Sequence, residues 1–263
     1  MKINLNKKDI NPETNSILIT GACGGIGQYL TQELSKSGWK VIATDLPNKT
    51  FEKDTLSNVY SFIKQDLQNL LIDTTENENF INHIKKCNSN FPLKAVINNA
   101  AIQNVKSFEE LTNEDWFKSI NVNLLAPISI SRSLMSILEE NQGSIINISS
   151  IHSILTKEGF SAYATTKAAL TGLTKSLSVE VGHKVRVNAI EPAAIETNML
   201  REGFVDKEFQ FKQLKDFHPT KSIGDPSDLL RALMFLLDPS NKFLNGCILS
   251  LTGGIHNKLH DPC

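Results

Sequence analysis

The chain has little net charge and few cysteines. Its 27 Lys and Arg residues nearly balance 28 Asp and Glu residues, which leaves a formal net charge of −1 at pH 7. This balance gives no electrostatic basis for binding nucleic acid or an anionic membrane. We therefore expect no nucleic-acid partner. The cysteines lack metal-ligand spacing and suit a reducing compartment, so we also expect no metal site; they are Cys23, Cys87, Cys247 and Cys263.

Long apolar runs, repeats and low-complexity linkers are also absent. No segment approaches the roughly 20 apolar residues of a membrane span. Residues 1–9 contain neither a long apolar segment nor a cleavage signal. A length of 263 residues is sufficient for one large core. We expect a single domain over residues 1–263, located in the cytoplasm and not in a membrane.

Strand-like and helix-like segments alternate along the chain. This alternation predicts an α/β fold: a Rossmann-like, doubly wound parallel sheet with helices on both faces and a core over about 15–255. The predicted strands lie near 16–20, 39–44, 59–63, 94–98, 144–149, 185–190 and 247–251. The predicted helices lie near 26–37, 76–88, 112–140, 161–181 and 226–237.

One stretch, residues 198–225, breaks the alternation and contains Phe204, Phe209, Phe211 and Phe217. Long insertions beside a site often act as lids, and we interpret this one as a substrate lid. Two surface helices that pack their phenylalanine faces together are an equal alternative.

A glycine-rich turn follows the first predicted strand. The run from Gly21 to Gly27 contains Gly21, Gly24, Gly25 and Gly27 and leads into a helix. Glycines allow a backbone to approach a pyrophosphate, and the helix N-terminus offers free N–H groups to the anion. A plain turn without a ligand is the alternative. If the turn does bind a dinucleotide, alkylation of Cys23 inside it could block cofactor binding. The alternative is that this thiol is only a small inert side chain.

An acid ends the second predicted strand. Asp45 lies 24 residues after Gly21, close to the interval of roughly 20 residues at which a carboxylate meets the adenosine ribose. A carboxylate accepts hydrogen bonds from ribose hydroxyls and repels a 2′-phosphate, so Asp45 favours NAD over NADP. Lys49 nearby leaves NADP use open.

Tyr163 and Lys167 are four residues apart and share one face of a predicted helix. A free tyrosine has a pKa near ~10, and an adjacent cation favours the phenolate. Such a pair suits an acid/base that interconverts an alcohol and a carbonyl. Chance spacing of Tyr and Lys on a helix is the alternative until the rest of the chain is considered.

Several further motifs occur in a characteristic order. Together the motifs make the chain resemble the short-chain dehydrogenase/reductase family over about 15–255. They are Thr20-Gly21 with Gly25-Ile26-Gly27, Asp66-Leu67, Asn98-Asn99-Ala100-Ala101, Asn121-Val122-Asn123-Leu124, Ser149-Ser150 with Tyr163 and Lys167, and Arg186-Val187-Asn188-Ala189-Ile190-Glu191-Pro192 followed by Thr197.

The resemblance implies a catalytic set of Asn123, Ser150, Tyr163 and Lys167. Tyr163 is the implied proton donor or acceptor and Ser150 the implied hydrogen-bond donor to the same oxygen. Lys167 would hold the ribose and lower the pKa of Tyr163, and Asn123 would position a water. The implied cofactor contacts are Gly21, Gly25, Ile26, Gly27, Asp45, Asp66, Leu67, Asn99, Ala100, Tyr163, Lys167, Pro192, Ile195 and Thr197.

Three residues depart from the family pattern: Ala101 and Ala193 replace glycines, and Thr252 replaces an acid. These changes affect loop shape and hence the substrate pocket more than the reaction type. The candidate substrate residues are Gln103, His152, Ser153, Phe160, Glu191, Ala194 and Met199.

Because His152 and Glu191 are polar, we expect NAD(H)-dependent oxidoreduction of a small hydroxylated substrate, such as a sugar or polyol derivative. Two alternatives remain. One is a 3-oxoacyl-(acyl-carrier-protein) reductase, and the other is a non-catalytic dinucleotide-sensing protein.

The long predicted helices also suggest self-association. Their apolar residues lie on more than one side, and family members of this type usually pair through these helices. We therefore expect a homo-oligomer, a tetramer or a dimer, since closed symmetry is common in soluble assemblies. The residues concerned are Leu124, Leu125, Ile128, Ile130, Leu134 and Ile137.

Overall fold

A parallel sheet organises the chain in the computed structural model, which describes residues 12–51, 53–70 and 72–259. Its strand order is β3-β2-β1-β4-β5-β6-β7, and every neighbouring pair is parallel. The strands are β1 (Ser16–Thr20), β2 (Lys40–Asp45), β3 (Ser61–Lys64), β4 (Leu93–Asn98), β5 (Ser144–Ile148), β6 (Arg186–Pro192) and β7 (Ile248–Leu251).

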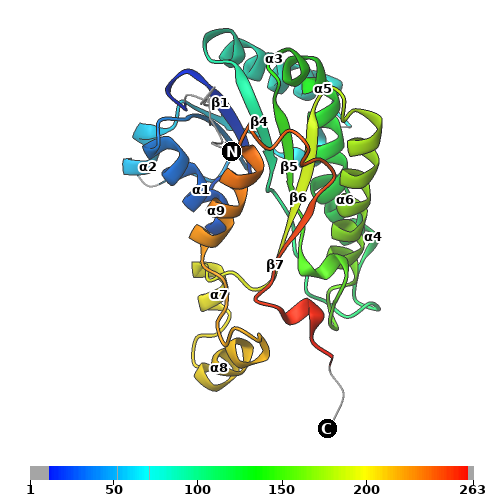
Figure 1. The fold of residues 1–263 in the computed structure, drawn as a ribbon. Helices are drawn as coiled ribbons and strands as arrows, with labels where there is room; N and C mark the ends of the chain where they lie inside the picture. Colours follow the sequence, from blue (N-terminus) through cyan, green and yellow to red (C-terminus); the bar gives the residue numbers. More distant parts are fainter. Residues whose placement is uncertain (1–11, 52, 71, 260–263) are drawn as a thin grey trace, which may run out of the picture.

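Helices cover both faces of the sheet, which confirms the predicted doubly wound fold. In Figure 1, α1, α2 and α9 lie on one face, and α3, α5 and α6 lie on the other. The helices are α1 (Gly25–Lys36), α2 (Lys53–Asn58), α3 (Thr74–Asn90), α4 (Asn113–Ile120), α5 (Ala126–Glu140), α6 (Ser161–Glu180), α7 (Asn198–Glu202), α8 (Glu208–Phe217) and α9 (Pro226–Leu237).

Alternating side chains of the strands build a core on each face. In β1, Ile17 and Ile19 join the cluster that contains Leu30 of α1 and Leu233 of α9. Leu18 between them joins the opposite cluster, with side chains of α3 and α5. This period of two, buried on both faces, is the pattern expected of a central parallel strand.

The predicted continuous helix over 112–140 is wrong, because a π-helical turn, η3 (Asn121–Leu125), separates α4 from α5. Pro127 stands in the first turn of α5. Proline has no N–H, so it cannot donate the usual bond to the carbonyl four residues earlier, that of Asn123. The turn accommodates this missing bond, and the Ala126 N–H reaches back to the Asn121 carbonyl.

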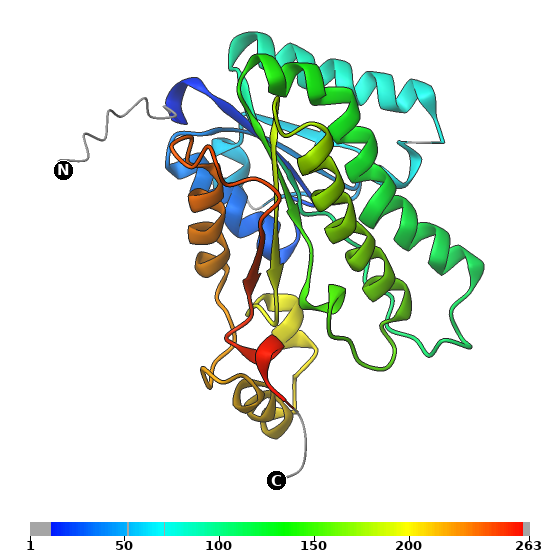
Figure 2. The same cartoon turned by 45° about the vertical axis from the view of Figure 1, so that its right-hand side comes forward.

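The stretch 198–225 forms the short helices α7 and α8, which lie beyond the ends of β6 and β7 (Figure 2). The rings of Phe204 and Phe211 pack with their centroids 5.4 Å apart. Phe209 and Phe217 are exposed. Two of the four phenylalanines therefore pack together, as the surface-helix interpretation expects, while closure over a site stays a prediction.

In residues 12–259 without 52 and 71, no helix is both long and apolar enough to cross a bilayer. Within the same residues, no cluster of three His, Cys, Asp or Glu side chains is arranged to hold a metal ion.

Candidate active site

The glycine turn lies where the strand order reverses, between β1 and its neighbours β2 and β4. Open parallel sheets bind ligands at such a point, outside the carboxyl ends of the strands. Gly21 has φ +62°, and a Cβ there would lie 2.7 Å from the Ala100 Cα. A Cβ on Gly25 would lie 2.7 Å from the Cβ of Thr197. A side chain at Gly21 would therefore clash with backbone atoms, and one at Gly25 would force Thr197 to shift.

The N-terminus of α1 fits the pyrophosphate of a dinucleotide. Its N-cap residue, Gly24, contributes no side-chain hydrogen bond, so no side chain competes for the first N–H groups of the helix. The Asn99 side chain donates to the carbonyls of Thr20 and Gly21, each at 3.0 Å. Asn99, predicted to contact the cofactor, thus also holds the turn in shape.

Asp45 ends β2 beside this turn. Its Oδ2 accepts the Cys23 N–H at 2.7 Å and its Oδ1 accepts the Leu46 N–H at 2.8 Å. Burial and the Asp45 charge raise the pKa of the Cys23 thiol to about 12, against the opposing effect of Lys49 and Lys64. The thiol is therefore protonated at neutral pH, which favours the interpretation of Cys23 as an inert side chain.

The other predicted cofactor residues line the same strand ends. Asp66 caps η2 (Leu67–Asn69) by accepting the Gln68 N–H at 3.0 Å, and Leu67 is buried in the core. Pro192 ends β6, and Ile195 forms a bridge with Gly224. Thr197 accepts the Leu200 N–H through its hydroxyl at 3.2 Å. Ile26 packs at the edge of the core, and Ala100 lies against Gly21.

Ser150, Tyr163 and Lys167 converge at the end of β5 and the start of α6. The Ser150 and Tyr163 side chains share a hydrogen bond. The Lys167 ammonium lies 5.6 Å from the centre of the Tyr163 ring and donates to the Ile148 carbonyl at 2.7 Å. A phenol, a hydroxyl and an amine are thereby gathered around one point, as proton transfer to a carbonyl oxygen requires.

The expected lowering of the Tyr163 pKa is wrong for this arrangement. Burial raises the pKa of the phenol above its usual value, and the hydrogen bond with Ser150 opposes that rise only in part. Lys167 is itself buried, which lowers its pKa from 10.5 to about 7. Burial thus disfavours the charged form of both side chains, and the cation that was expected to favour the phenolate is itself destabilised.

Asn123 is fully buried behind the site. Its Oδ1 accepts the Ile102 N–H at 2.7 Å, and its Nδ2 donates to the Ile102 carbonyl and the Thr166 hydroxyl at 2.9 and 3.0 Å. Thr166 immediately precedes Lys167, so the side chain links the loop after β4 to the catalytic turn of α6. A position for water at the Asn123 side chain stays a prediction.

Two predicted substrate residues lie beside the phenol. His152, in η4 (Ile151–Ser153), stacks on Phe160 with a centroid distance of 4.5 Å. Its ring also packs edge-to-face with that of Tyr163, with a centroid distance of 5.5 Å. Burial and the nearby Lys157 lower the pKa of His152. The imidazole is therefore neutral at pH 7 and adds a flat, uncharged wall to the site.

The remaining substrate candidates differ in how far they are exposed to solvent. Gln103 is exposed, Ser153 and Ala194 are half-buried, and Glu191 is only 1% exposed. Met199 lies on α7, but its side chain is outside the described residues. Only His152 and Phe160 are brought into contact with Tyr163 by a described ring contact.

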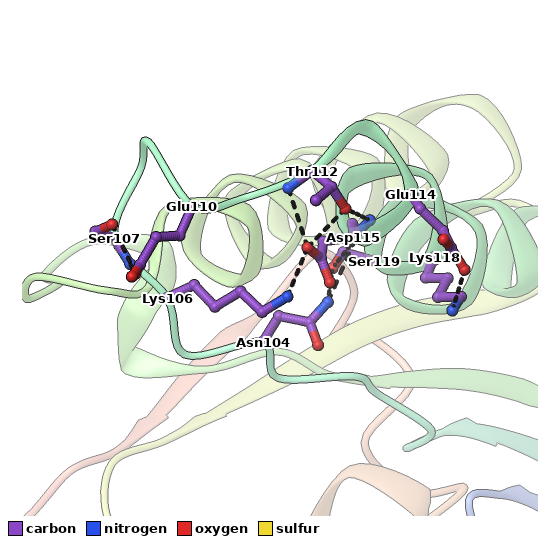
Figure 3. A network of polar contacts seen from close by, with 9 residues as sticks. All are labelled: Asn104, Lys106, Ser107, Glu110, Thr112, Glu114, Asp115, Lys118 and Ser119. Atoms are coloured by element: carbon purple, nitrogen blue, oxygen red, sulfur yellow. Dashed lines mark hydrogen bonds and ion pairs between the residues drawn. The ribbon is translucent and has the colours of Figure 1, made fainter.

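A polar network that the sequence analysis missed braces the loop between β4 and α4 (Figure 3). Asp115 accepts bonds from the Lys106 ammonium at 2.8 Å and from Thr112, which lowers the pKa of its carboxyl to about 2. Asn104 donates toward the Ser119 hydroxyl. The spacing of Thr112 and Asp115 is that of a capping box, a signal visible in the sequence.

Comparison with known proteins identifies relatives along almost the whole chain. Residues 15–208 match the family model described as short chain dehydrogenase. The chain is 32% identical over 240 residues to carbonyl reductase (NADPH) 2 of Sus scrofa, covering 90% of this chain and 94% of the relative. It is 31% identical over 247 residues to 5-keto-D-gluconate 5-reductase of Escherichia coli strain K12, covering 91% and 94%.

A third relative and two solved structures extend the comparison. The chain is 27% identical to the 3-oxoacyl-(acyl-carrier-protein) reductase of Buchnera aphidicola, covering 93% of this chain and 98% of the relative. Ligand-free aldohexose dehydrogenase of Thermoplasma acidophilum aligns with a TM-score of 0.84, 26% identity and coverage of 95% and 97%. 4-hydroxyisoleucine dehydrogenase complexed with NADH aligns with a TM-score of 0.84, 26% identity and coverage of 93% and 100%.

Proposed function

The chain belongs to the short-chain dehydrogenase family of oxidoreductases, and from this premise we propose that it interconverts a secondary alcohol and a carbonyl on a small polar substrate with NAD(H). The observation that carries the proposal is the convergence of Ser150, Tyr163 and Lys167 at the strand ends beside the glycine turn.

The residues at the switch point fit a nicotinamide dinucleotide. The uncapped start of α1 would hold the pyrophosphate, and Asp45 the adenosine ribose. Pro192, Ile195 and Thr197 would lie against the nicotinamide end. Hydride transfer to or from the substrate carbon is the chemistry that a bound nicotinamide supplies.

The chain's own residues would transfer the proton of the substrate hydroxyl. Tyr163 would take the proton from the substrate hydroxyl in oxidation and return it in reduction. Ser150, which already shares a hydrogen bond with Tyr163, would donate to the same substrate oxygen as charge develops there. Lys167, whose amine lies 5.6 Å from the centre of the Tyr163 ring, would hold the nicotinamide ribose hydroxyls beside the phenol.

NAD is favoured over NADP by the carboxylate of Asp45. Lys64 is its register partner on β3, and Lys49 lies close enough to influence the same thiol, so two cations accompany the carboxylate. The relatives include an enzyme named for NADPH and a structure that contains NADH. Our choice of NAD rests on the carboxylate, which accepts a hydrogen bond from the turn at the Cys23 N–H.

A sugar or polyol derivative is the substrate class that we propose. His152 and Phe160 form a flat wall beside Tyr163, and the His152 imidazole is a polar group on that wall. Relatives that act on keto-gluconate and aldohexose support the same class. The helices α7 and α8 would close over this substrate as a lid.

A second candidate is reduction of a 3-oxoacyl chain tethered to a carrier protein, favoured by the Buchnera aphidicola relative. It would require a basic docking surface. The end of α5 carries Glu139 and Glu140 instead, which argues against an acidic carrier at that position.

Turnover of a panel of polyols, ketoses, simple alcohols and a 3-oxoacyl thioester with NAD(H) and NADP(H) tests the function. Tyr163→Phe is the matched control, because it removes only the phenolic hydroxyl. We expect wild-type turnover on a polyol or ketose and a loss of ~10²–10⁴-fold in the variant, with NADH binding retained. Preference for the thioester would support the carrier-protein candidate. NADH binding with no turnover on any substrate would support a dinucleotide sensor.

A further inference from the structure

Glu191 is a buried carboxylate that joins three elements of the site. It lies on β6 with 1% of its surface exposed. Its Oε1 accepts the Thr171 hydroxyl of α6 at 2.7 Å and also the Ser153 hydroxyl of η4. Among the described residues, no polar partner reaches Oε2. One oxygen atom therefore ties β6 both to the helix of Tyr163 and to the turn that begins at Ser150.

A chain of hydroxyls continues from this carboxylate toward Lys167. The Thr171 and Ser149 hydroxyls lie 2.8 Å apart, and Ser149 Oγ is 3.0 Å from the Lys167 carbonyl. Thr171 has one hydroxyl proton, which it donates to Glu191, so Ser149 is the donor toward Thr171 or toward the carbonyl. Ser149 also stands between Ile148, whose carbonyl receives the Lys167 ammonium, and Ser150.

Burying a carboxylate without a cation is unfavourable unless hydrogen bonds compensate. No ion pair between Glu191 and a described cation is observed, and its hydrogen bonds come only from Thr171 and Ser153. Both donors belong to elements that carry the reacting groups. The location of these bonds points to a task in the active site more than to general stability.

We propose that Glu191 is a positioning residue, which rests on the function proposed above. Through Thr171 and Ser153, its Oε1 fixes the distance between the Tyr163–Lys167 turn of α6 and the Ser150 turn. Proton transfer depends on that distance, since a misplacement of about 1 Å costs roughly 10²-fold in rate. This positioning role differs from the substrate contact that the sequence analysis expected for Glu191, because its carboxylate is buried.

Two substitutions at Glu191 separate hydrogen bonding from charge. Glu191→Ala removes the acceptor, whereas the amide oxygen of Glu191→Gln still accepts from Thr171 and Ser153. We expect Glu191→Ala to lower kcat by about 10- to 100-fold and to shift the pH dependence of kcat, with KM and the NADH dissociation constant changed less than about threefold. Glu191→Gln should restore kcat to within about threefold of wild type, together with the wild-type pH profile.

Thr171→Val provides a matched test from the other side of the bond. Valine has nearly the shape of threonine without its hydroxyl, so it removes the α6 contact while Glu191 remains. We expect a loss of kcat between those of the two Glu191 variants. Ser153→Ala does the same for the turn after β5. If circular dichroism shows that Glu191→Ala does not fold, Thr171→Val and Ser153→Ala test the positioning role in its place.

Three outcomes would overturn the proposal. The first is a folded Glu191→Ala enzyme with kcat within about threefold of wild type. The second is an increase in KM alone, which would indicate contact with the substrate. The third is equal loss in the Gln and Ala variants, which would indicate a role for charge. Tyr163→Phe, measured in parallel, reports on the proposed function separately, because wild-type turnover in that variant contradicts the function and not the role of Glu191.

Discussion

At the scale of single residues, Lys167 shows how burial determines chemistry. Its amine is enclosed at the base of the site and meets the Ile148 carbonyl, not a carboxylate. Burial lowers its pKa from 10.5 to about 7. The same enclosure that makes the lysine able to exchange protons at neutral pH also lowers the stability of the fold.

Lys167→Met should stabilise the protein while abolishing turnover. Between about pH 7 and 10.5 the unfolded chain binds more protons at Lys167 than the folded chain does, so wild-type stability rises with pH across this window. At ~1.4 kcal/mol per pKa unit the variant gains on the order of a few kcal/mol near pH 7. Its advantage should shrink as the pH approaches 10.5.

Urea unfolding of wild type and Lys167→Met near pH 6, 7.5 and 9 measures this difference. Arg186→Met is a useful comparison, because Arg186 is a partly buried cation that remains charged throughout this range. A stability difference for Lys167→Met that is constant or widens with pH would contradict the assignment.

Asp45→Ser should weaken NAD binding and reduce the preference of the enzyme for NAD over NADP. The carboxylate is expected to bond the ribose hydroxyls, and charge-assisted bonds contribute ~1.5–3 kcal/mol each. Losing one corresponds to roughly ten- to hundredfold in affinity. The measurement is kcat/KM with both cofactors on one substrate.

The Asp45 comparison needs a control for the turn itself, because the carboxylate also accepts the Cys23 and Leu46 N–H groups. Asp45→Asn retains an acceptor for one of these bonds and removes the charge. If wild type uses NADP as well as NAD, the interpretation of Asp45 is wrong, and Lys49 and Lys64 become the residues to substitute.

Single residues were predictable from the sequence where the local pattern carries the information. The interval from Ser150 to Tyr163 and the spacing to Lys167 indicated the residues that the fold brings together. The enclosure of Glu191 was not predictable, because its partners come from 20 and 38 residues away along the chain. The raised pKa of Tyr163 depends on the same tertiary burial.

At the scale of elements, the site is built from interruptions of regular structure. The π-helical turn η3 places Asn123 against Ile102 and Thr166, and Pro127 explains why the helix cannot run straight through. The apolar pattern over 112–140 could not show this break, since amphipathic periodicity continues across a proline in the first turn of a helix.

Gly25→Ala should weaken NADH binding without unfolding the protein. The added Cβ would lie 2.7 Å from Thr197 Cβ and 2.9 Å from its Cγ2, so the threonine and its loop must shift. We expect the NADH dissociation constant to rise by about tenfold, equivalent to ~1.4 kcal/mol. Fluorescence titration with NADH measures the change.

Gly172→Ala is the control for this experiment. Gly172 is exposed within α6, and a Cβ there would meet nothing within 4 Å. Alanine is favoured over glycine in a helix interior by roughly 0.5–1 kcal/mol, so this variant should be slightly stabilised and bind NADH normally. Wild-type NADH affinity in Gly25→Ala would show that the turn does not hold the cofactor.

At the scale of the whole molecule, strand order brings distant segments to one edge. The carboxyl ends of β1, β2, β4, β5 and β6 carry the glycine turn, Asp45, Asn99, Ser150 and Pro192 in that order. The alternation of strands and helices was sufficient to predict a parallel sheet with helices on both faces, because parallel strands require crossovers of one hand, but it did not give the strand order. The helices α7 and α8 break the alternation, and the sequence left open whether they pack on the surface or act as a lid.

Three of the apolar residues that suggested self-association are buried within the protein itself. Ile130, Leu134 and Ile137 lie in the chain's own core and offer nothing to a partner. Other apolar side chains remain exposed on the outer helices: Phe117 of α4 is 65% exposed and Val179 of α6 is 87% exposed. Since α4 packs against α6 in the same layer, these residues are candidates for a shared interface.

We therefore expect a homo-oligomer that is disrupted by a charge on this layer. Light scattering after gel filtration should give two or four times the 29.2 kDa chain mass for wild type. Val179→Glu and Phe117→Glu should reduce that mass, because an unpaired carboxylate is costly to bury in an interface. Ile72→Glu, at another exposed apolar position, is the control and should leave the mass unchanged.

A wild-type mass of one chain at micromolar concentration would refute the expectation. Unchanged assembly in both α4 and α6 variants would instead direct attention to Phe235, which is 54% exposed on α9, at the other side of the sheet.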